Sequence, residues 1–145
     1  MPARVAWSPA QLALFERKGP KGRRPARGKP KPALERATHI ALADLLRAKA
    51  RPDVFWTHIP AGEYRAWSTG KLLKRMGLKP GLPDFVFIDR QGRHFYLELK
   101  RGQLGEVSLG QELFGSLMLE RGVPYAIAYG FAEAEAQLRE WCVLR

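Results

Sequence analysis

The stretch PGLPDFVFIDRQGRHFYLELKRG, residues 80–102, decides the fold predicted for this chain. Two apolar runs rich in aromatic and branched residues flank the turn-prone tetrad RQGR. That pattern is typical of a β-hairpin. Side chains alternate across a strand, so Phe95, Leu97 and Leu99 share one face, which we expect to belong to the core.

The same stretch carries polar residues close to both strands. Glu98 and Lys100 share the other face of the second strand, and Asp84 stands directly before the first. With the usual twist of a hairpin, Asp84 can converge on them. Two interpretations are open: an ordinary pairing of surface charges, or a site that holds a divalent cation.

Upstream of the hairpin, the sequence predicts a helix, a strand and a second helix. Residues 32–53 have apolar positions at helical spacing, and Pro52 ends that pattern. Residues 53–60 alternate as a strand does, and residues 61–77 read as a loop that runs into a short basic helix.

Downstream of the hairpin, Ser108 can cap a helix over residues 109–122. A buried strand at 123–130 and an amphipathic helix at 131–141 follow. We therefore expect a mixed β-sheet flanked by helices, in the α/β or α+β class.

Residues 1–31 form a separate basic segment in this interpretation. Ser8 can cap a short helix over residues 8–19, and residues 17–32 are nearly all Lys, Arg, Gly and Pro. Many like charges with nothing to bury predict a flexible tether, so the compact domain spans residues 32–145. The tether is either a solvated linker or an arm that neutralises phosphates.

The charge balance favours a polyanionic partner. The 145 residues include 25 Lys+Arg against 14 Asp+Glu, which gives a formal net charge of +11. Nucleic acid is the leading partner class, although an anionic membrane surface or an acidic protein would satisfy the same attraction. The single cysteine excludes an intrachain disulfide and a cysteine zinc cage. Since no apolar run is long enough for a secretory signal or a membrane span, we expect a soluble cytoplasmic protein.

A site that cleaves phosphodiesters needs the residue types found around the hairpin. Carboxylates are the ligands that a hard divalent cation prefers, and such a cation binds phosphate and lowers the pKa of a water molecule. A lysine can orient that water and offset charge in the transition state. Asp84 and Glu98 supply the carboxylates, Lys100 supplies the amine, and the backbone carbonyl of Leu99 is a further candidate ligand.

Several short motifs, in this order, resemble the virus-type replication-repair nuclease (VRR-NUC) domain of the PD-(D/E)XK nuclease superfamily. They are a helix bearing Glu35, GLPD at 81–84, LELK at 97–100, SLGQ at 108–111 and LMLERGVPYAIAYG at 117–130. The likeness covers about residues 35–141 and is to short stand-alone phage and bacterial members. The segment PAGEYR, residues 60–65, departs from the asparagine- and glycine-rich loop that relatives often carry, which leaves the shape of the substrate open.

The resemblance implies an endodeoxyribonuclease dependent on Mg²⁺ or Mn²⁺, with an active site of Glu35, Asp84, Glu98, Lys100 and Gln111. Asp84 and Glu98 would bind the cation directly, and Glu35 would act through water or a second ion. Lys100 would manage the nucleophilic water, and Gln111 would orient Lys100 or the phosphate. The resemblance also implies a homodimer that acts on branched DNA as Holliday junction resolvases do.

Structural roles remain open for several of these positions. Gln111 is three residues after Ser108, so it can close a capping box. Glu35 lies near a helix N-terminus and can interact favourably with the macrodipole there. His39, one turn after Glu35, and His58 can face the site or be ordinary surface residues.

Basic residues on both sides of the hairpin are candidates for contacting DNA phosphates. They are Lys71, Lys74, Arg75, Lys79 and Arg101, with Arg23, Arg24 and Arg27 of the tether. An alternative from another class is a non-catalytic nucleic-acid-binding module with a nuclease-like fold. A third is a small basic adaptor whose tail binds an acidic partner. The clustered carboxylates favour the enzyme.

Overall fold

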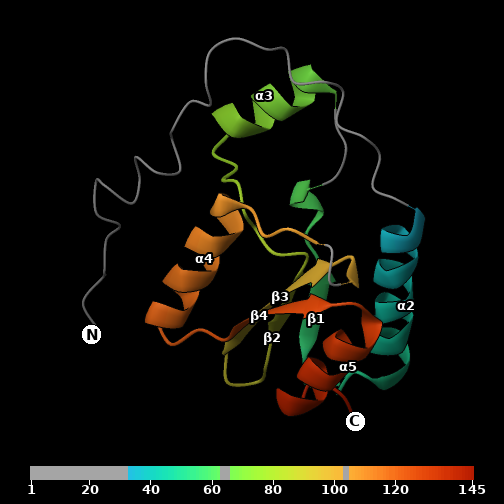
Figure 1. Ribbon diagram of the computed structural model, residues 1–145. Coiled ribbons are helices and arrows are strands. Elements are labelled where there is room, and N and C mark those ends of the chain that lie inside the picture. Colours follow the sequence, from blue (N-terminus) through green and yellow to red (C-terminus); the bar gives the residue numbers. More distant parts are fainter. Residues whose placement is uncertain (1–32, 63–65, 103–104) are drawn as a thin grey trace, which may run out of the picture.

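The computed structural model describes residues 33–62, 66–102 and 105–145. In chain order, the elements are α2 (Ala33–Lys49), β1 (Phe55–His58), the 3₁₀ turn η1 (Pro60–Gly62), α3 (Trp67–Arg75), β2 (Phe85–Ile88), β3 (His94–Lys100), α4 (Leu109–Glu120), β4 (Tyr125–Tyr129) and α5 (Phe131–Glu140) (Figure 1). The predicted order of helices and strands is confirmed over these ranges. The helix expected over 8–19, the tether, and Arg23, Arg24 and Arg27 lie outside the described residues.

The strands form a mixed sheet in the order β1-β2-β3-β4. β1 and β2 pair antiparallel, and so do β2 and β3, the predicted hairpin, in which Phe85 lies opposite Leu97. β4 pairs parallel with β3, and α4 makes the crossover that a parallel pair requires. The fold is therefore α+β, with helices flanking a mixed sheet, as the sequence predicts.

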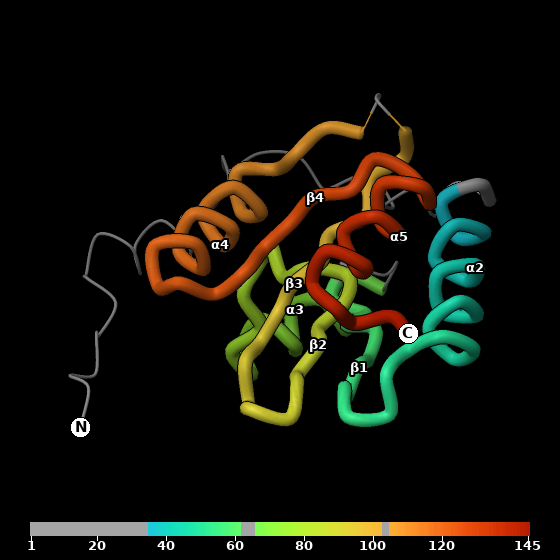
Figure 2. Tube along the Cα trace, turned by 90° about the horizontal axis from the view of Figure 1, so that it is seen from below, coloured from blue at the N-terminus to red at the C-terminus, as the bar shows by residue number. Residues whose placement is uncertain are grey.

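Helices cover both faces of this sheet. α2 and α5 pack on the face that carries the apolar alternation, and the side chains buried there include Leu42, Leu46, Leu138, Phe85, Phe87 and Leu97. α4 covers the other face, where the Phe114 ring meets the rings of Tyr96 and Tyr125 edge-on. Figure 2 shows α4 on one side of the strands, with α2 and α5 on the other.

The C-terminus is tied to the end of the first described helix. Ala50 bridges Leu144, and the Arg145 N–H donates to the Lys49 carbonyl oxygen at 2.8 Å. This closure holds α2 against α5 and the sheet, which fixes the helix that carries Glu35 and His39.

α3 lies apart from the sheet (Figure 1), and none of its residues is buried. Trp67 and Leu72 on the helix, and Met76 just after it, are each more than half exposed. The Lys71 ammonium lies 5.0 Å from the centre of the Trp67 ring. The predicted short basic helix is confirmed, and it presents both apolar and cationic groups to solvent.

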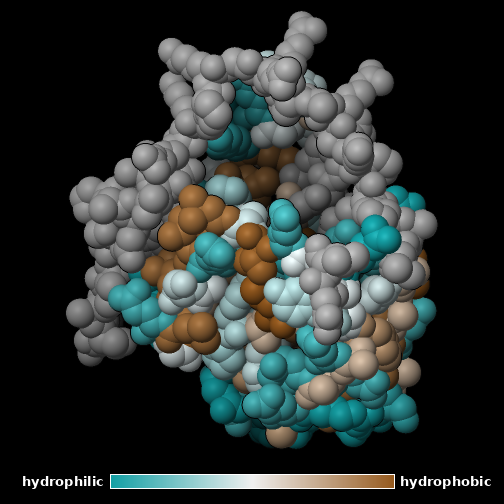
Figure 3. Space-filling view, viewed as in Figure 1, coloured by the Kyte–Doolittle hydropathy of each residue, from teal (hydrophilic) through white to brown (hydrophobic). Residues whose placement is uncertain are grey.

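Further apolar surface lies over α4, where hydrophobic colour gathers in Figure 3. Leu109 and Leu119, at the two ends of that helix, are each 60% exposed. No helix within the described ranges combines the length and the apolar character needed to cross a bilayer.

Candidate functional site

Glu98 and Lys100 form a buried ion pair on the α4 side of β3. Lys100 Nζ lies 3.0 Å from Glu98 Oε1, and the two side chains are only 12% and 6% exposed. The chain after β3 folds back closely over Lys100, because a Cβ added at Gly105 would lie 2.7 Å from the Lys100 Cβ. This burial contradicts the interpretation of Glu98 and Lys100 as an ordinary surface charge pair.

Gln111, in the first turn of α4, joins this ion pair to a helix cap. Its Oε1 accepts from Lys100 Nζ at 2.6 Å and from the Ser108 backbone N–H at 3.0 Å. Its Nε2 donates to Glu98 Oε1, and its own N–H donates to Ser108 Oγ. The capping box expected from sequence is present, and the same side chain also orients Lys100 and Glu98.

Asp84 is held in place through its backbone and its side chain. It follows the buried Pro83 and is itself 7% exposed. Its Oδ2 accepts the Leu99 N–H at 2.8 Å, and its backbone oxygen accepts the Ile59 N–H at 2.7 Å. The carboxylate is therefore fixed against β3, the strand that carries Glu98.

Asp84 and Glu98 lie at the same end of the sheet. Phe85 opposes Leu97 in the hairpin, so one further step of that register sets Asp84 against Glu98. Burial raises the pKa of the Tyr125 hydroxyl well above its usual range, and the negative charges of Glu98 and Asp84 raise it further. Both carboxylates thus act electrostatically on the hydroxyl of Tyr125, a residue that the sequence did not single out.

Tyr125 reaches this position because Gly115 of α4 makes room for its ring. A Cβ at Gly115 would come within 2.5 Å of the Tyr125 ring. The hydroxyl is buried and has no hydrogen-bond partner among the described residues. No local pattern in the sequence signals this contact, since it depends on how α4 packs over β4.

Two histidines approach Asp84 from the α2 side. His39 Nε2 lies 3.7 Å from Asp84 Oδ2, and His58 Nδ1 lies 2.8 Å from the Asp84 backbone oxygen. One ligand atom from each of His39, His58 and Asp84 lies within 4.8 Å of the other two. Glu35 and Glu98 are not members of that group. The sequence leaves open whether His39 and His58 face the site or lie on the surface, and in the structure both are partly buried next to Asp84.

The remaining predicted residues lie on α2, on α3 and in the segments that precede β2 and follow β3. Glu35 is in the first turn of α2, one turn before His39 and so on the same side of the helix. Lys71, Lys74 and Arg75 are exposed on α3, Arg101 is exposed after β3, and Lys79 is partly buried. The roles of Glu35, of the Leu99 carbonyl and of these basic residues stay predictions.

The donor set fits a divalent cation. Buried carboxylates are costly unless hydrogen bonds, opposite charges or metal ions compensate them. Asp84 and Glu98 are the two carboxylates among the buried polar residues of the described chain, and they come from adjoining strands at one end of the sheet. Together with the neighbouring ammonium of Lys100, they could hold a cation and a phosphate.

Comparison with known proteins bears on the fold. Neither a protein-family model nor a curated protein matches this sequence. A solved structure titled "VRR_NUC domain protein" is similar, with a TM-score of 0.62 and 16% identity over 79% of this chain and 92% of that one. Another, titled "VRR_NUC domain", has a TM-score of 0.51 and 15% identity over 75% of this chain and 97% of that one. The described part of this chain therefore has the fold of the VRR-NUC domain, as the resemblance in its motifs led us to expect.

Proposed function

We propose that this protein is a metal-dependent nuclease that hydrolyses phosphodiester bonds in DNA. The observation that carries the proposal is the buried contact of Glu98, Lys100 and Gln111 beside the fixed carboxylate of Asp84. An acid, an amine and an amide oriented in this way are the groups that cation-assisted phosphodiester hydrolysis uses. The likeness of the fold to the VRR-NUC domain supports a nuclease-type function for these groups.

The two carboxylates would hold Mg²⁺ or Mn²⁺, with the Leu99 carbonyl oxygen as a further ligand and Glu35 acting through water or a second ion. When bound, such a cation polarises the phosphate and lowers the pKa of a water molecule. The Leu99 N–H keeps Asp84 Oδ2 directed at β3, so this carboxylate needs little reorganisation before it acts.

Lys100 would orient the attacking water and offset the negative charge that develops on the phosphate. Its ammonium is held by Glu98 and by the Gln111 amide, in surroundings with little solvent. Electrostatic interactions are stronger in such surroundings than in water, and a fixed donor costs no reorganisation during the reaction. Gln111 is a positioning residue, because it acts through Lys100 and Glu98.

Charge and resemblance support a branched DNA substrate. A net charge of +11 favours a polyanion, and the exposed cations of α3 and Arg101 would supply phosphate contacts. Resemblance to short VRR-NUC members adds the proposal of a cytoplasmic homodimer that cuts branched DNA as a Holliday junction resolvase does.

A cleavage panel tests the proposal. Purified protein is incubated with labelled four-way junction, fork, flap and linear DNA, in Mg²⁺, in Mn²⁺ and in EDTA, and the cut positions are mapped. We expect metal-dependent cuts with a preference for branched substrates. Binding without strand cuts on every substrate and in both metals would instead favour a non-catalytic binding module.

A further inference from the structure

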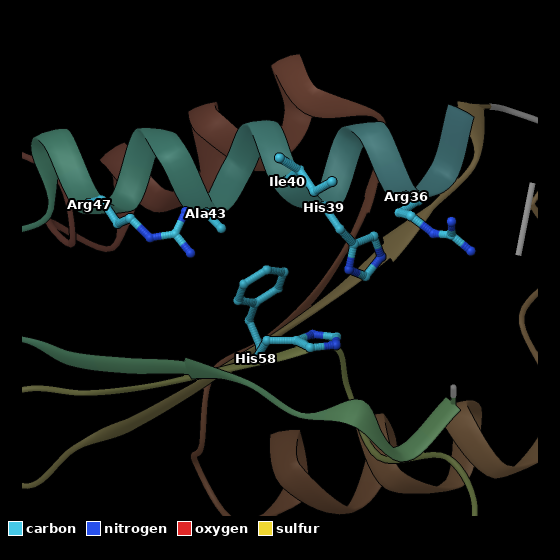
Figure 4. A pocket seen from close by; sticks show the side chains of 7 residues that line it. Arg36, His39, Ile40, Ala43, Arg47 and His58 are labelled. Carbon is cyan, nitrogen blue, oxygen red and sulfur yellow. The ribbon is translucent and has the colours of Figure 1, made fainter. Parts of the chain in front are cut away.

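His39 and His58 have no part in the mechanism proposed above, although they come from separate elements to meet at Asp84. His39 lies on α2, His58 ends β1, and Asp84 precedes β2. Figure 4 shows the two imidazoles facing one another across the space between α2 and β1. Their ring centres are 5.4 Å apart, with the ring planes nearly perpendicular.

We propose that His39, His58 and Asp84 form a binding site for a divalent transition metal of borderline softness, with Zn²⁺ as the type. Imidazole suits Zn²⁺, Co²⁺ and Ni²⁺, whereas Mg²⁺ demands oxygen ligands and keeps much of its water. The site shares Asp84 with the one proposed for catalysis but takes its other two ligands from histidines, and its metal binding can be measured without nuclease activity.

The contact of His58 with the backbone prepares its ring to bind a metal. The Asp84 carbonyl oxygen can only accept a hydrogen bond, so the proton of that 2.8 Å contact lies on His58 Nδ1. In this tautomer, Nε2 is the ring nitrogen that can bind a metal. Metal-binding histidines are generally held this way, with the other ring nitrogen donating to a carbonyl or carboxylate.

The distances are close to those a metal requires. Bonds of 2.0–2.2 Å in a tetrahedral site separate neighbouring ligand atoms by about 3.4 Å. His39 Nε2 and Asp84 Oδ2 are 3.7 Å apart, and one ligand atom from each of the three side chains lies within 4.8 Å of the other two. Small side-chain rotations would close that gap, and three protein ligands leave a position for water.

A cavity gives an ion a path to the two histidines. Its volume is about 310 Å³, and it is lined by His39, His58, Phe85, Ile40 and the arginines Arg36 and Arg47. Repulsion by the two guanidinium groups is weak, because both are exposed and Arg47 pairs with Asp44 at 2.7 Å.

The small number of candidate ligands makes a sharp test possible. The whole chain contains three histidines and one cysteine. His94 on β3 is therefore a matched control for the two proposed ligands, and a variant of Cys142 tests whether the single thiol binds the metal instead. EDTA-stripped full-length protein is titrated with Zn²⁺ by calorimetry in millimolar Mg²⁺, and with Co²⁺ by visible absorbance.

We expect the parent, His94→Gln and Cys142→Ser to bind a single Zn²⁺ equally well. His39→Gln and His58→Gln should each weaken binding by about tenfold or more. Thermal melts without metal establish that the variants are folded.

In the unaltered parent, NMR of ¹⁵N-labelled histidine should show Zn²⁺ shifting two imidazoles and leaving the third unchanged. This measurement needs no variant. Zn²⁺ affinity that survives both His39→Gln and His58→Gln, or is lost in Cys142→Ser, would overturn the proposal, as would absence of the two shifts.

Discussion

Gln111 serves a helix cap and a buried ion pair with one amide. An amide can accept from Lys100 and donate to Glu98 at the same time, which neither a carboxylate nor an amine can do. Lysine loses much rotamer freedom when its ammonium is fixed. Here Lys100 loses that conformational entropy when the chain folds, so its ammonium is already oriented before a substrate binds.

The two roles of Gln111 can be separated by comparison with Ser108→Ala. Loss of the Ser108 side chain removes the cap and should cost about 1 kcal/mol of stability without displacing Lys100. Gln111→Ala should lower the free energy of unfolding by a similar amount. It should also slow single-turnover DNA cleavage about tenfold or more, since it releases Lys100 and Glu98. Equal cleavage by the two variants would show that Gln111 acts only as a cap.

Two substitutions of Asp84 separate its hydrogen bond from its charge. Asp84→Ala leaves the buried Leu99 N–H without its acceptor, at a cost of about 1–3 kcal/mol. Asp84→Asn keeps an acceptor oxygen and removes a negative charge near Glu98, so it should unfold in urea, with EDTA present, close to the parent midpoint. Equal destabilisation by both variants would contradict the role given to the Leu99 contact.

At the scale of elements, the site depends on how the loop before β2 docks against the start of α4. A Cβ at Gly81 would lie 2.1 Å from the Gly110 carbonyl and 2.7 Å from the Gln111 nitrogen. Gly81 also has φ +84°, which glycine adopts freely. Two glycines thus bring the backbone leading to Asp84 against the helix that carries Gln111.

Gly81→Ala should therefore be costly, and Gly92→Ala in the hairpin turn is its matched control. Gly92 has a similar φ of +77° but open space around it, so that substitution isolates backbone strain, about 1–2 kcal/mol. Gly81→Ala adds a backbone clash and should cost about 1–3 kcal/mol more, with a loss of cleavage that Gly92→Ala does not share. Equal unfolding free energies for the two variants, measured in urea, would contradict this docking.

Local sequence patterns predict the helices and strands well, but they do not predict contacts between segments that are distant in the sequence. Alternation in 94–100 predicted β3 and its core face, and the spacing of Ser108 and Gln111 predicted a capping box. The meeting of His39, His58 and Asp84 depends on where α2 crosses the sheet, which periodicity does not encode. The packing of Tyr125 against Gly115 likewise follows from the parallel register of β4.

At the scale of the whole molecule, charge and shape favour a DNA backbone near the site. α3 lies apart from the sheet and presents Lys71, Lys74 and Arg75 to solvent. Exposed cations of this kind supply affinity that falls with salt and does not depend on sequence. In the proposed nuclease, such affinity would bring a duplex to the protein and leave Lys100 and the carboxylates for the chemical step.

Replacing Lys71, Lys74 and Arg75 together by alanine should lower the salt dependence of DNA binding. If each neutralises a phosphate, the slope of log affinity against log salt falls by up to about 2.7. Arg139→Ala on α5, where the arginine is 57% exposed and pairs with Glu135, is the control and should leave the slope unchanged. An unchanged slope in the triple variant would assign the DNA contacts to another surface.

The most direct measurement is single-turnover cleavage of a labelled four-way junction in Mg²⁺ by Glu98→Gln and Lys100→Gln, with Glu106→Gln as the control. Glu106 is an exposed carboxylate in the loop after β3, so its loss should leave the rate unchanged. We predict that Glu98→Gln and Lys100→Gln still bind the junction but lose cleavage by at least about a hundredfold. Cleavage at the parental rate by either variant would contradict this prediction.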